Sequence, residues 1–254
     1  MLGPRIVFRN EPMRPHNLPM VLLGVGLLWF GWFGFNAGSA MAADAPPPRC
    51  SSTPWSPAAP ACSAGCSSSR SATAHPTTFG AASGVVAGLV AITPSCGWVG
   101  MVGAAVIGVV AGAVCSFAVG WKFRFGYDDS LDVVGVHLVG GVVGTVLIGL
   151  LASEVMTGGV EGLFYGGGFA QLGKQVLAVA VVGLYAFGVT YGLGKLIDRV
   201  VGFRVSADQE TSGIDLALHA ESAYEHAVLA HGAPTGLFGR EHERPRPEPE
   251  SDVV

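Results

Sequence analysis

Long apolar runs separated by short polar segments are the main pattern along this chain of 254 residues. A helix needs about 20 consecutive apolar residues to cross a bilayer. Runs of this length predict five membrane helices and an all-α integral membrane protein. They cover residues 18–41, 78–96, 98–120, 131–152 and 175–197.

Small residues recur at every fourth position in two of these runs. Such spacing lets helix backbones approach closely in lipid. We therefore expect these faces to pack against other helices rather than to line a pore. The residues are Gly80, Gly84 and Gly88 in one run and Gly108, Gly112, Ser116 and Gly120 in the other.

Composition supports a membrane protein. The chain is 50% hydrophobic and 13% charged, and its mean hydropathy is +0.50. Soluble domains carry about 25% charged residues. The net charge of -4 adds little to this picture, because most charged residues lie outside the apolar runs.

Basic residues flank the apolar runs and predict their orientation, since loops rich in Lys and Arg face the cytoplasm. The N-terminal segment, the loop after the third run and the C-terminal tail are therefore expected to be cytoplasmic in a multi-pass protein of the cell membrane. The N-terminal segment and the loop after the third run must then be separated by an even number of crossings. Only three apolar runs lie between them. The basic residues are Arg5, Arg9 and Arg14, then Lys122 and Arg124, then Lys195, Arg199 and Arg204.

Residues 42–76 lie where the missing crossing is expected, and they contain no Val, Ile, Leu, Phe, Met or Tyr. As written, this composition predicts disorder. Codons for residues 50–56 can be chosen so that a frame one base earlier encodes Val-Phe-Val-Asn-Thr-Met-Val. We therefore interpret the stretch as a frameshifted segment that hides an apolar crossing; the alternative is a disordered loop.

His137 is the candidate for chemistry within the membrane, because it is the one histidine of seven that lies in an apolar run. Intramembrane ionisable groups are functional candidates by default. A neutral imidazole could donate and accept hydrogen bonds to a small ligand or pass a proton; a buried histidine bonded to a backbone carbonyl is the equal alternative. Asp132, five residues earlier, is expected to cap the helix and favour its dipole rather than to attract cations.

Residues 28–40 concentrate aromatic side chains and end in a short polar set that includes Asn36 and Ser39. Ring faces attract cations, although aromatic residues also anchor helices at the membrane interface. The Ser39 hydroxyl could bind a ligand at an extracellular mouth. The aromatic residues are Trp29, Phe30, Trp32, Phe33 and Phe35.

Cysteines and catalytic motifs do not indicate an enzyme. Cys96 and Cys115 are isolated, as small packing residues usually are, and the other three cysteines lie in 42–76. The sequence contains no phosphate-binding loop, nucleophile elbow or pair of catalytic carboxylates. We expect no enzyme activity, cofactor, metal or nucleic-acid partner.

Four segments resemble the ammonium transporter (Amt/Rh) family. Residues 11–20 resemble its central cytoplasmic loop, 28–40 its sixth helix, 77–97 its eighth and 132–141 its tenth. The tail follows the family pattern through Tyr224. The resemblance covers most of the chain apart from 42–76.

This resemblance implies the second half of an eleven-helix fold whose first ten helices form two inverted repeats. The seventh helix would be the disrupted one. The family assembles as a trimer in which each subunit has a narrow apolar pore. By the same resemblance, Trp32 is a pore-lining residue, Phe35 gates the pore, Ser39 belongs to the outer ammonium site, and His137 is the second of two pore histidines.

In the family, ammonium binds outside and loses its proton before ammonia crosses. That order avoids placing a cation in a low-dielectric pore. The first five helices, with the first pore histidine, would be missing here, so we expect a truncated chain that transports little or nothing. The alternative is an ammonium-sensing membrane receptor or regulatory subunit. The tail resembles the segment that couples subunits and responds to PII-type signal proteins.

These inferences divide the chain into five expected regions. They are a cytoplasmic N-terminal segment (1–17), a membrane helix (18–41), the frameshifted or disordered segment (42–76), a membrane domain of four helices (77–201) and a cytoplasmic tail (202–254) that is disordered from about residue 240.

Overall fold

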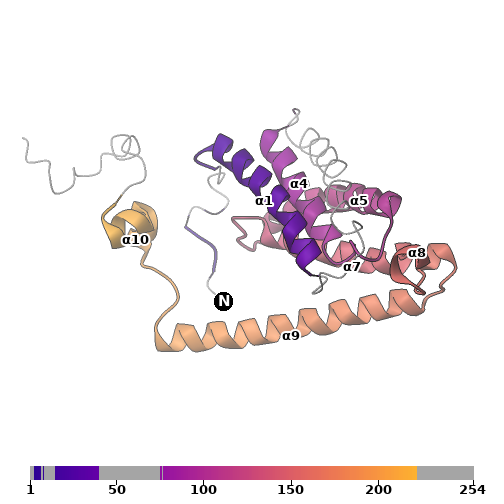
Figure 1. Cartoon of the computed structure of the whole chain (residues 1–254). Helices are drawn as coiled ribbons and strands as arrows, with labels where there is room; N and C mark the ends of the chain where they lie inside the picture. Colours follow the sequence, from indigo (N-terminus) through magenta and orange to yellow (C-terminus); the bar gives the residue numbers. More distant parts are fainter. Residues whose placement is uncertain (1–2, 7, 9–14, 40–74, 76, 222–254) are drawn as a thin grey trace, which may run out of the picture. The chain divides into compact units, whose positions relative to one another are not determined.

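The computed structural model describes residues 3–6, 8, 15–39, 75 and 77–221 (Figure 1). Nearly all of the 42–76 stretch, with Cys50, Cys62 and Cys66, lies outside the described residues, as does the tail beyond residue 221. The predictions of a frameshifted segment and of a disordered C-terminus therefore fall outside them too. The chain divides into two units, Met1–Phe203 and Arg204–Val254, and each is described by itself.

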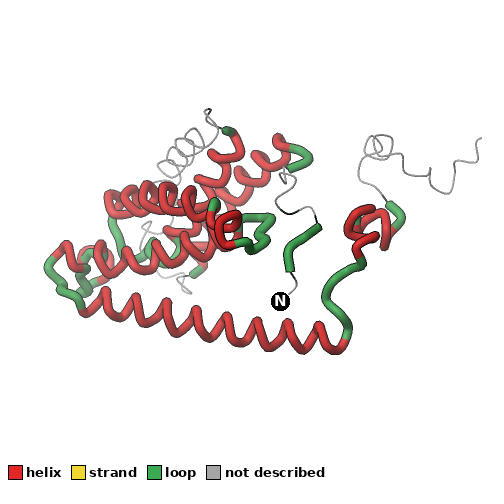
Figure 2. Tube along the Cα trace, turned by 180° about the vertical axis from the view of Figure 1, so that it is seen from behind, coloured by secondary structure: helices red, strands yellow, loops and turns green. Residues whose placement is uncertain are grey.

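All regular structure among the described residues is helical, and these residues contain no strand (Figure 2). Each of the five apolar runs contains helical structure. In the first unit the helices are α1 (Leu18–Gly38), α4 (Thr78–Ile92), α5 (Met101–Val119), α6 (Trp121–Phe125), the π-helix η1 (Val133–Leu138), α7 (Val139–Leu151), α8 (Glu154–Thr157), the 3-10 helix η2 (Leu163–Tyr165) and α9 (Ala170–Val200).

Polar side chains begin two of the membrane helices. The Asn17 side chain accepts a hydrogen bond from the Met20 N–H at 3.0 Å, which caps α1. The Thr77 hydroxyl accepts one from the Gly80 N–H at 3.0 Å, which caps α4. Each bond satisfies a donor that the first turn of a helix leaves unpaired.

Four helical stretches are long and apolar enough to cross a membrane: Leu18–Gly38, Met101–Phe125, Val133–Leu151 and Ala170–Val200. The fifth, α4, has 15 residues and is followed by turns over residues 93–98. Pro94 lacks a backbone N–H and so cannot donate the hydrogen bond that would continue the helix. The helix therefore ends before the apolar run does.

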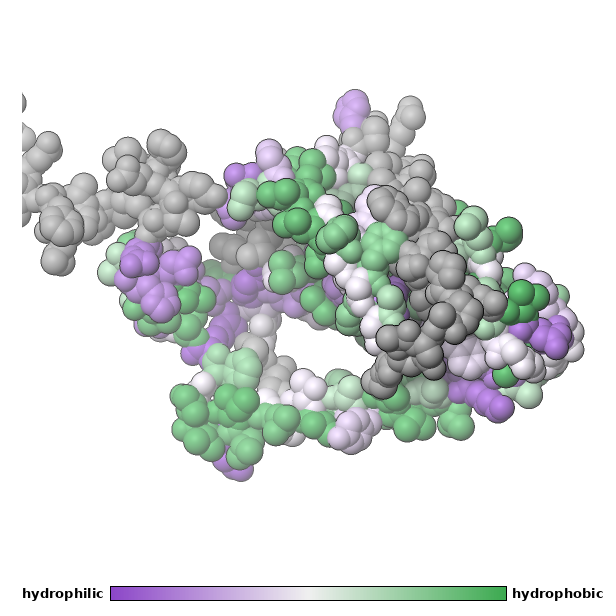
Figure 3. Space-filling view, in the orientation of Figure 1, coloured by the Kyte–Doolittle hydropathy of each residue, from purple (hydrophilic) through white to green (hydrophobic). Residues whose placement is uncertain are grey.

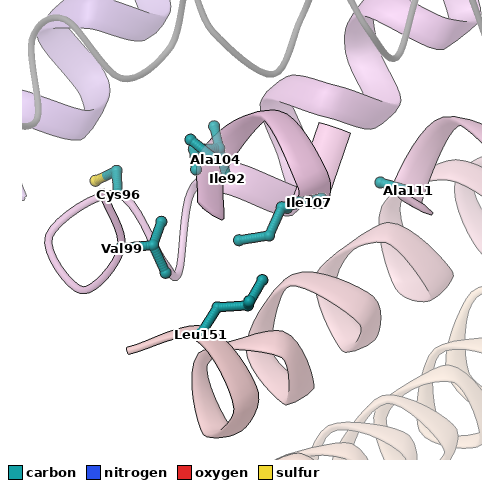
Figure 4. Close-up of a cluster of buried hydrophobic side chains, with 8 residues drawn as sticks. Ile92, Cys96, Val99, Ala104, Ile107, Ala111 and Leu151 are labelled. Carbon is teal, nitrogen blue, oxygen red and sulfur yellow. The ribbon is translucent and has the colours of Figure 1, made fainter. Parts of the chain in front are cut away.

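Helices α4, α5 and α7 enclose the main apolar core (Figure 4). Ile92 and Ile107 have no exposed surface, and Leu151 from α7 packs against them. The glycines predicted to face other helices agree with this arrangement, because Gly84, Gly88, Gly108 and Gly112 are buried. Gly120, at the end of the α5 stripe, is exposed.

Helix α7 approaches its neighbours closely at glycine positions. A Cβ atom on Gly144 would clash with the backbone carbonyl of Ala91 in α4. One on Gly149 would lie 2.5 Å from the Cα of Leu172 in α9. These glycines allow backbone contact between helices, as small residues do in membrane proteins.

Helices α1 and α9 leave most of their apolar side chains exposed. In the most apolar 18-residue stretch of each, none of the residues is buried. Figure 3 shows hydrophobic residues along the surface of the long helix α9. Exposed apolar surface of this extent marks contact with lipid or with another protein.

The second unit begins with a short capped helix, α10 (Ala207–Ser212), followed by the π-helix η3 (Asp215–His219). Ser206 and Gln209 form a reciprocal capping box at its start. Gly213 has φ 93° and ends α10. Arg204 pairs with Glu210 at 2.9 Å.

We predict that Gly144→Ala destabilises the helix assembly, whereas Gly141→Ala does not. The added methyl at Gly144 meets the Ala91 backbone, and overpacking of this kind costs about 1–3 kcal/mol. A Cβ on Gly141 meets no atom within 4 Å. Unfolding free energies measured by titration with sodium dodecyl sulfate in mixed micelles would test this. Equal losses in both variants would contradict the packing argument.

Candidate functional site

Trp32 is held by a side chain of the neighbouring helix. Its indole Nε1–H donates a hydrogen bond to the Thr93 hydroxyl at 2.8 Å, and this hydroxyl donates to the Leu89 carbonyl at 2.8 Å. Trp32 also packs against Val85 and Leu89 of α4. The indole orientation is therefore fixed by both a polar and an apolar contact. No pattern in the sequence indicates Thr93 as the partner of Trp32.

Phe35 and Ser39 continue the same helix toward its end. The Trp32 and Phe35 rings lie 5.5 Å apart between centroids and are tilted by 48°. Phe35 keeps 58% of its surface exposed. The Ser39 hydroxyl donates to the Phe35 carbonyl at 2.9 Å, so its lone pairs remain available to a donor.

Asn36 is the buried polar residue of this segment. The residue is 1% exposed, and neither its amide oxygen nor its amide nitrogen has a hydrogen-bond partner among the described residues. Burying such a group without a partner costs about 1–3 kcal/mol. Residue type alone indicated a polar group near the outer end of the helix, but not its burial.

His137 lies in the π-helix η1, directly before α7. The residue is exposed, and its ring makes no hydrogen bond to another described residue. The structure therefore does not support the alternative of a buried histidine bonded to a backbone carbonyl. Short π-helical turns are uncommon and are frequent at functional sites.

Asp132 occupies the N-cap position of η1, as expected, but its side chain makes no capping hydrogen bond. It adopts left-handed geometry at φ 57°, which costs an L-residue roughly 1–2 kcal/mol. Its carboxylate pairs with Lys122 at 2.5 Å. The side-chain capping bonds are made by Asp129 instead. Its carboxylate accepts hydrogen bonds from the N–H groups of Val133 at 2.9 Å and Val134 at 2.8 Å. A choice between two nearby aspartates cannot be made from helix-dipole preference alone.

A second ion pair joins the N-terminal segment to the same loop. Arg5 donates to Asp128 from its backbone N–H at 2.8 Å and from two guanidinium nitrogens at 2.6 Å each. The hydrogen bonds from Arg5 hold the pKa of the Asp128 carboxyl below its usual range. The sequence indicated the orientation of these basic residues, but not their partners.

The structure brings together three of the four predicted site residues. Trp32, Phe35 and Ser39 follow one another along α1, and the first two are in ring contact. His137 comes from a separate element, and no hydrogen bond links it to the three among the described residues. Helix α4 packs against both α1 and η1 and so connects the two parts of the candidate site.

Sequence comparison decides the family. The model described as the Ammonium Transporter Family matches residues 1–224. The chain belongs to this ammonium transporter family. It is 50% identical over 236 residues to an ammonium transporter of Mycobacterium tuberculosis, covering 91% of this chain and 50% of that protein. It is 41% identical over 236 residues to ammonium transporter Amt1 of Archaeoglobus fulgidus, covering 88% of this chain and 56% of Amt1.

Solved ammonium transporter family structures share the fold. Saccharomyces cerevisiae Mep2 matches with a TM-score of 0.74 and 34% identity, over 82% of this chain and 50% of Mep2. A structure named Sensor Amt Protein matches with a TM-score of 0.74 and 30% identity, over 85% of this chain and 54% of that one. The predicted family and all-α membrane fold are confirmed. The chain spans about half the length of these relatives.

We predict that Thr93→Val loosens Trp32 and lowers the free energy of unfolding by about 0.5–1.5 kcal/mol, the usual net value of one hydrogen bond. Thr93→Ser keeps the hydroxyl that accepts from the indole, so it should lose less. Unfolding in mixed micelles, followed by circular dichroism, measures both variants. If valine were tolerated better than serine, the hydrogen bond would not stabilise this helix pair.

Proposed function

We propose that this chain forms part of an ammonium transporter, in which ammonium is recruited and deprotonated and ammonia crosses through a hydrophobic pore. The observation that carries the proposal is the family match over residues 1–224. The local arrangement of Trp32, Phe35 and Ser39 on one helix supports it.

These three residues suit recruitment of ammonium. The ion carries a positive charge and only donors, so it needs ring faces and an acceptor. The Trp32 and Phe35 rings offer the first. Ser39 offers the second, because its own proton is engaged by the Phe35 carbonyl. Phe35 is also exposed and so is accessible for the proposed gating role.

His137 suits the step in which ammonia crosses the pore. A neutral imidazole carries one donor nitrogen and one acceptor nitrogen, so it can hydrogen-bond ammonia on either side. Its ring makes no hydrogen bond within the described part of the chain, which leaves both nitrogens available. Moving ammonia rather than ammonium past this residue avoids the desolvation of a cation in an apolar passage.

The proposed setting is the cell membrane, with the N-terminal segment 1–17 and the tail 202–254 in the cytoplasm. The exposed apolar helices α1 and α9 support contact with lipid, and the basic loops support this orientation. We further propose a homotrimer in the intact family member and a PII-type signal protein at the tail. Residues 18–41 and 77–201 would form the membrane part.

The stretch 42–76 is proposed to arise from a shifted reading frame, since its composition cannot supply the crossing that the flanking charges require. We propose no enzyme activity, because the relatives from Mycobacterium tuberculosis and Archaeoglobus fulgidus are named ammonium transporters and the sequence holds no catalytic motif. The chain alone is proposed to conduct little or nothing.

A second candidate is an ammonium sensor or regulatory subunit. The observation that favours it is the match to the structure named Sensor Amt Protein. Sensing would require ammonium binding without net uptake, which a transport assay distinguishes from the leading proposal.

Transport is best tested on this chain and on a chimera. The chimera carries the frame-corrected 42–76 stretch, joined to the part of the Mycobacterium tuberculosis relative that this chain does not match. Radiolabelled methylammonium uptake into proteoliposomes should be near background for the chain and clear for the chimera. Binding without uptake by the chimera would favour the sensor, and neither binding nor uptake would overturn both proposals.

We predict that His137→Leu lowers uptake by the chimera at least about tenfold, since positioned proton-transfer groups contribute about 100-fold or more. Phe35→Leu should also lower uptake, because it removes a ring face that attracts the ammonium ion. Phe30→Leu is the matched control, because Phe30 lies on the same helix and is 78% exposed, and it should change uptake less than about twofold. Undiminished uptake in both test variants would show that Phe35 and His137 do not take part in transport.

A further inference from the structure

The orientation of His137 depends on an unusual turn. A π-helix closes its hydrogen bonds one residue further along the chain than an α-helix does. Here the Val139 N–H donates to the Val134 carbonyl, five residues back. One extra residue rotates a side chain by about 100° relative to an α-helical path, because 3.6 residues make one turn. The π-turn therefore decides which direction the imidazole faces.

The His137 ring cannot fix this direction itself, since it makes no hydrogen bond to another described residue. The backbone around it is held from one side by α5. A Cβ on Gly135 would lie 2.8 Å from the Cα of Val119, so this glycine rests directly against the α5 backbone. The Cys115 thiol also contacts the Val136 carbonyl at 3.7 Å as a weak donor.

At the N-terminal end of the π-turn, polar contacts with α6 hold the backbone. The Lys122 ammonium donates to the Asp132 carboxylate at 2.5 Å and to the Asp129 carbonyl at 3.1 Å. Only 14% of the Lys122 side chain and 12% of the Asp132 side chain are exposed. The Asp132 carbonyl in turn accepts the Val136 N–H at 2.8 Å, one residue before His137.

We infer that the ion pair between Lys122 and Asp132 positions His137. It holds Asp132 in the left-handed geometry that starts the π-turn, and the turn sets the direction of the imidazole. Lys122 and Asp132 are thus positioning residues that act through the backbone and do not touch the substrate. The inference rests on the proposed function only in taking His137 as a pore residue.

The test uses the whole 254-residue chain in lipid nanodiscs, with ¹⁵N-labelled histidine and nuclear magnetic resonance. His137→Gln identifies the His137 ring signals by their loss. Asp132→Gly is the central variant, because it removes the carboxylate and leaves a residue that populates φ > 0 and φ < 0 about equally, so that nothing holds position 132 in left-handed geometry. Lys122→Gln removes the positive charge that pairs with Asp132, and Lys122→Arg keeps it.

We expect the His137 ring signals to shift by more than a line width, or to split, in Asp132→Gly and Lys122→Gln. Lys122→Arg should stay close to the unchanged chain. The matched control is Arg204→Gln, which breaks the 2.9 Å pair with Glu210 in the other unit and should leave His137 unaffected. The His219 signals serve as an internal reference for Lys122 and Asp132 variants.

Unchanged His137 signals in Asp132→Gly and Lys122→Gln, with helix content preserved by circular dichroism, would overturn the inference. So would an equal shift in Lys122→Arg and Lys122→Gln. If one variant fails to fold, the other still decides, because the two remove opposite ends of the same pair. The readout involves no ammonium, so a chimera that fails to transport while these shifts occur would overturn the proposed function and leave this inference intact.

Discussion

The membrane unit depends on the close approach of α7 to the helices around it. Lipid is as apolar as the helix surfaces, so burying them against one another gains little from the hydrophobic effect, and van der Waals contact must hold them. Glycines supply that contact, with Gly144 against the Ala91 carbonyl and Gly149 against the backbone of Leu172. Helix α7 thereby joins α4 to α9, and it also completes the core that Ile107 of α5 shares with Ile92.

This packing fixes the two parts of the candidate site to different degrees. The π-turn η1 runs directly into α7 and rests on α5 through Gly135, so its position follows from the core. Helix α1 is attached mainly through α4, by the bond from Trp32 to Thr93 and the apolar contacts at Leu89. Helix α4 is therefore the element whose displacement would change the distance between the ammonium-binding and histidine parts of the proposed pathway.

Features that depend on spacing along one helix were predictable from the sequence, and features that depend on the path of a loop were not. Apolar runs located the helices, and positions 32, 35 and 39 fall on one face because a helix repeats every 3.6 residues. The pairing of Asp132 with Lys122 depends on how residues 126–132 turn back. A π-turn differs from an α-turn by one residue, which periodicity over six positions does not resolve. The hydrogen bond of Thr93 could not be predicted from spacing along one helix either, because its partner, Trp32, lies 61 residues earlier on another helix.

Hydrogen bonding separates polar residues that maintain the fold from those with capacity left for a ligand. The three aspartates of the loop before η1 are all engaged, each by a cation or by helix N–H groups. Within the described part of the chain, the buried Asn36 amide has no hydrogen-bond partner, and the ring of the exposed His137 makes no hydrogen bond. Ser39 uses its proton but keeps its lone pairs. Buried polar groups in folded proteins are nearly always paired, and departures from that rule concentrate at functional sites. Asn36 is such a departure, and it lies on the helix that carries Trp32 and Phe35. Ser39 and His137 are exposed, so their open hydrogen-bonding positions follow from their location on the surface of this chain, where a ligand can reach them.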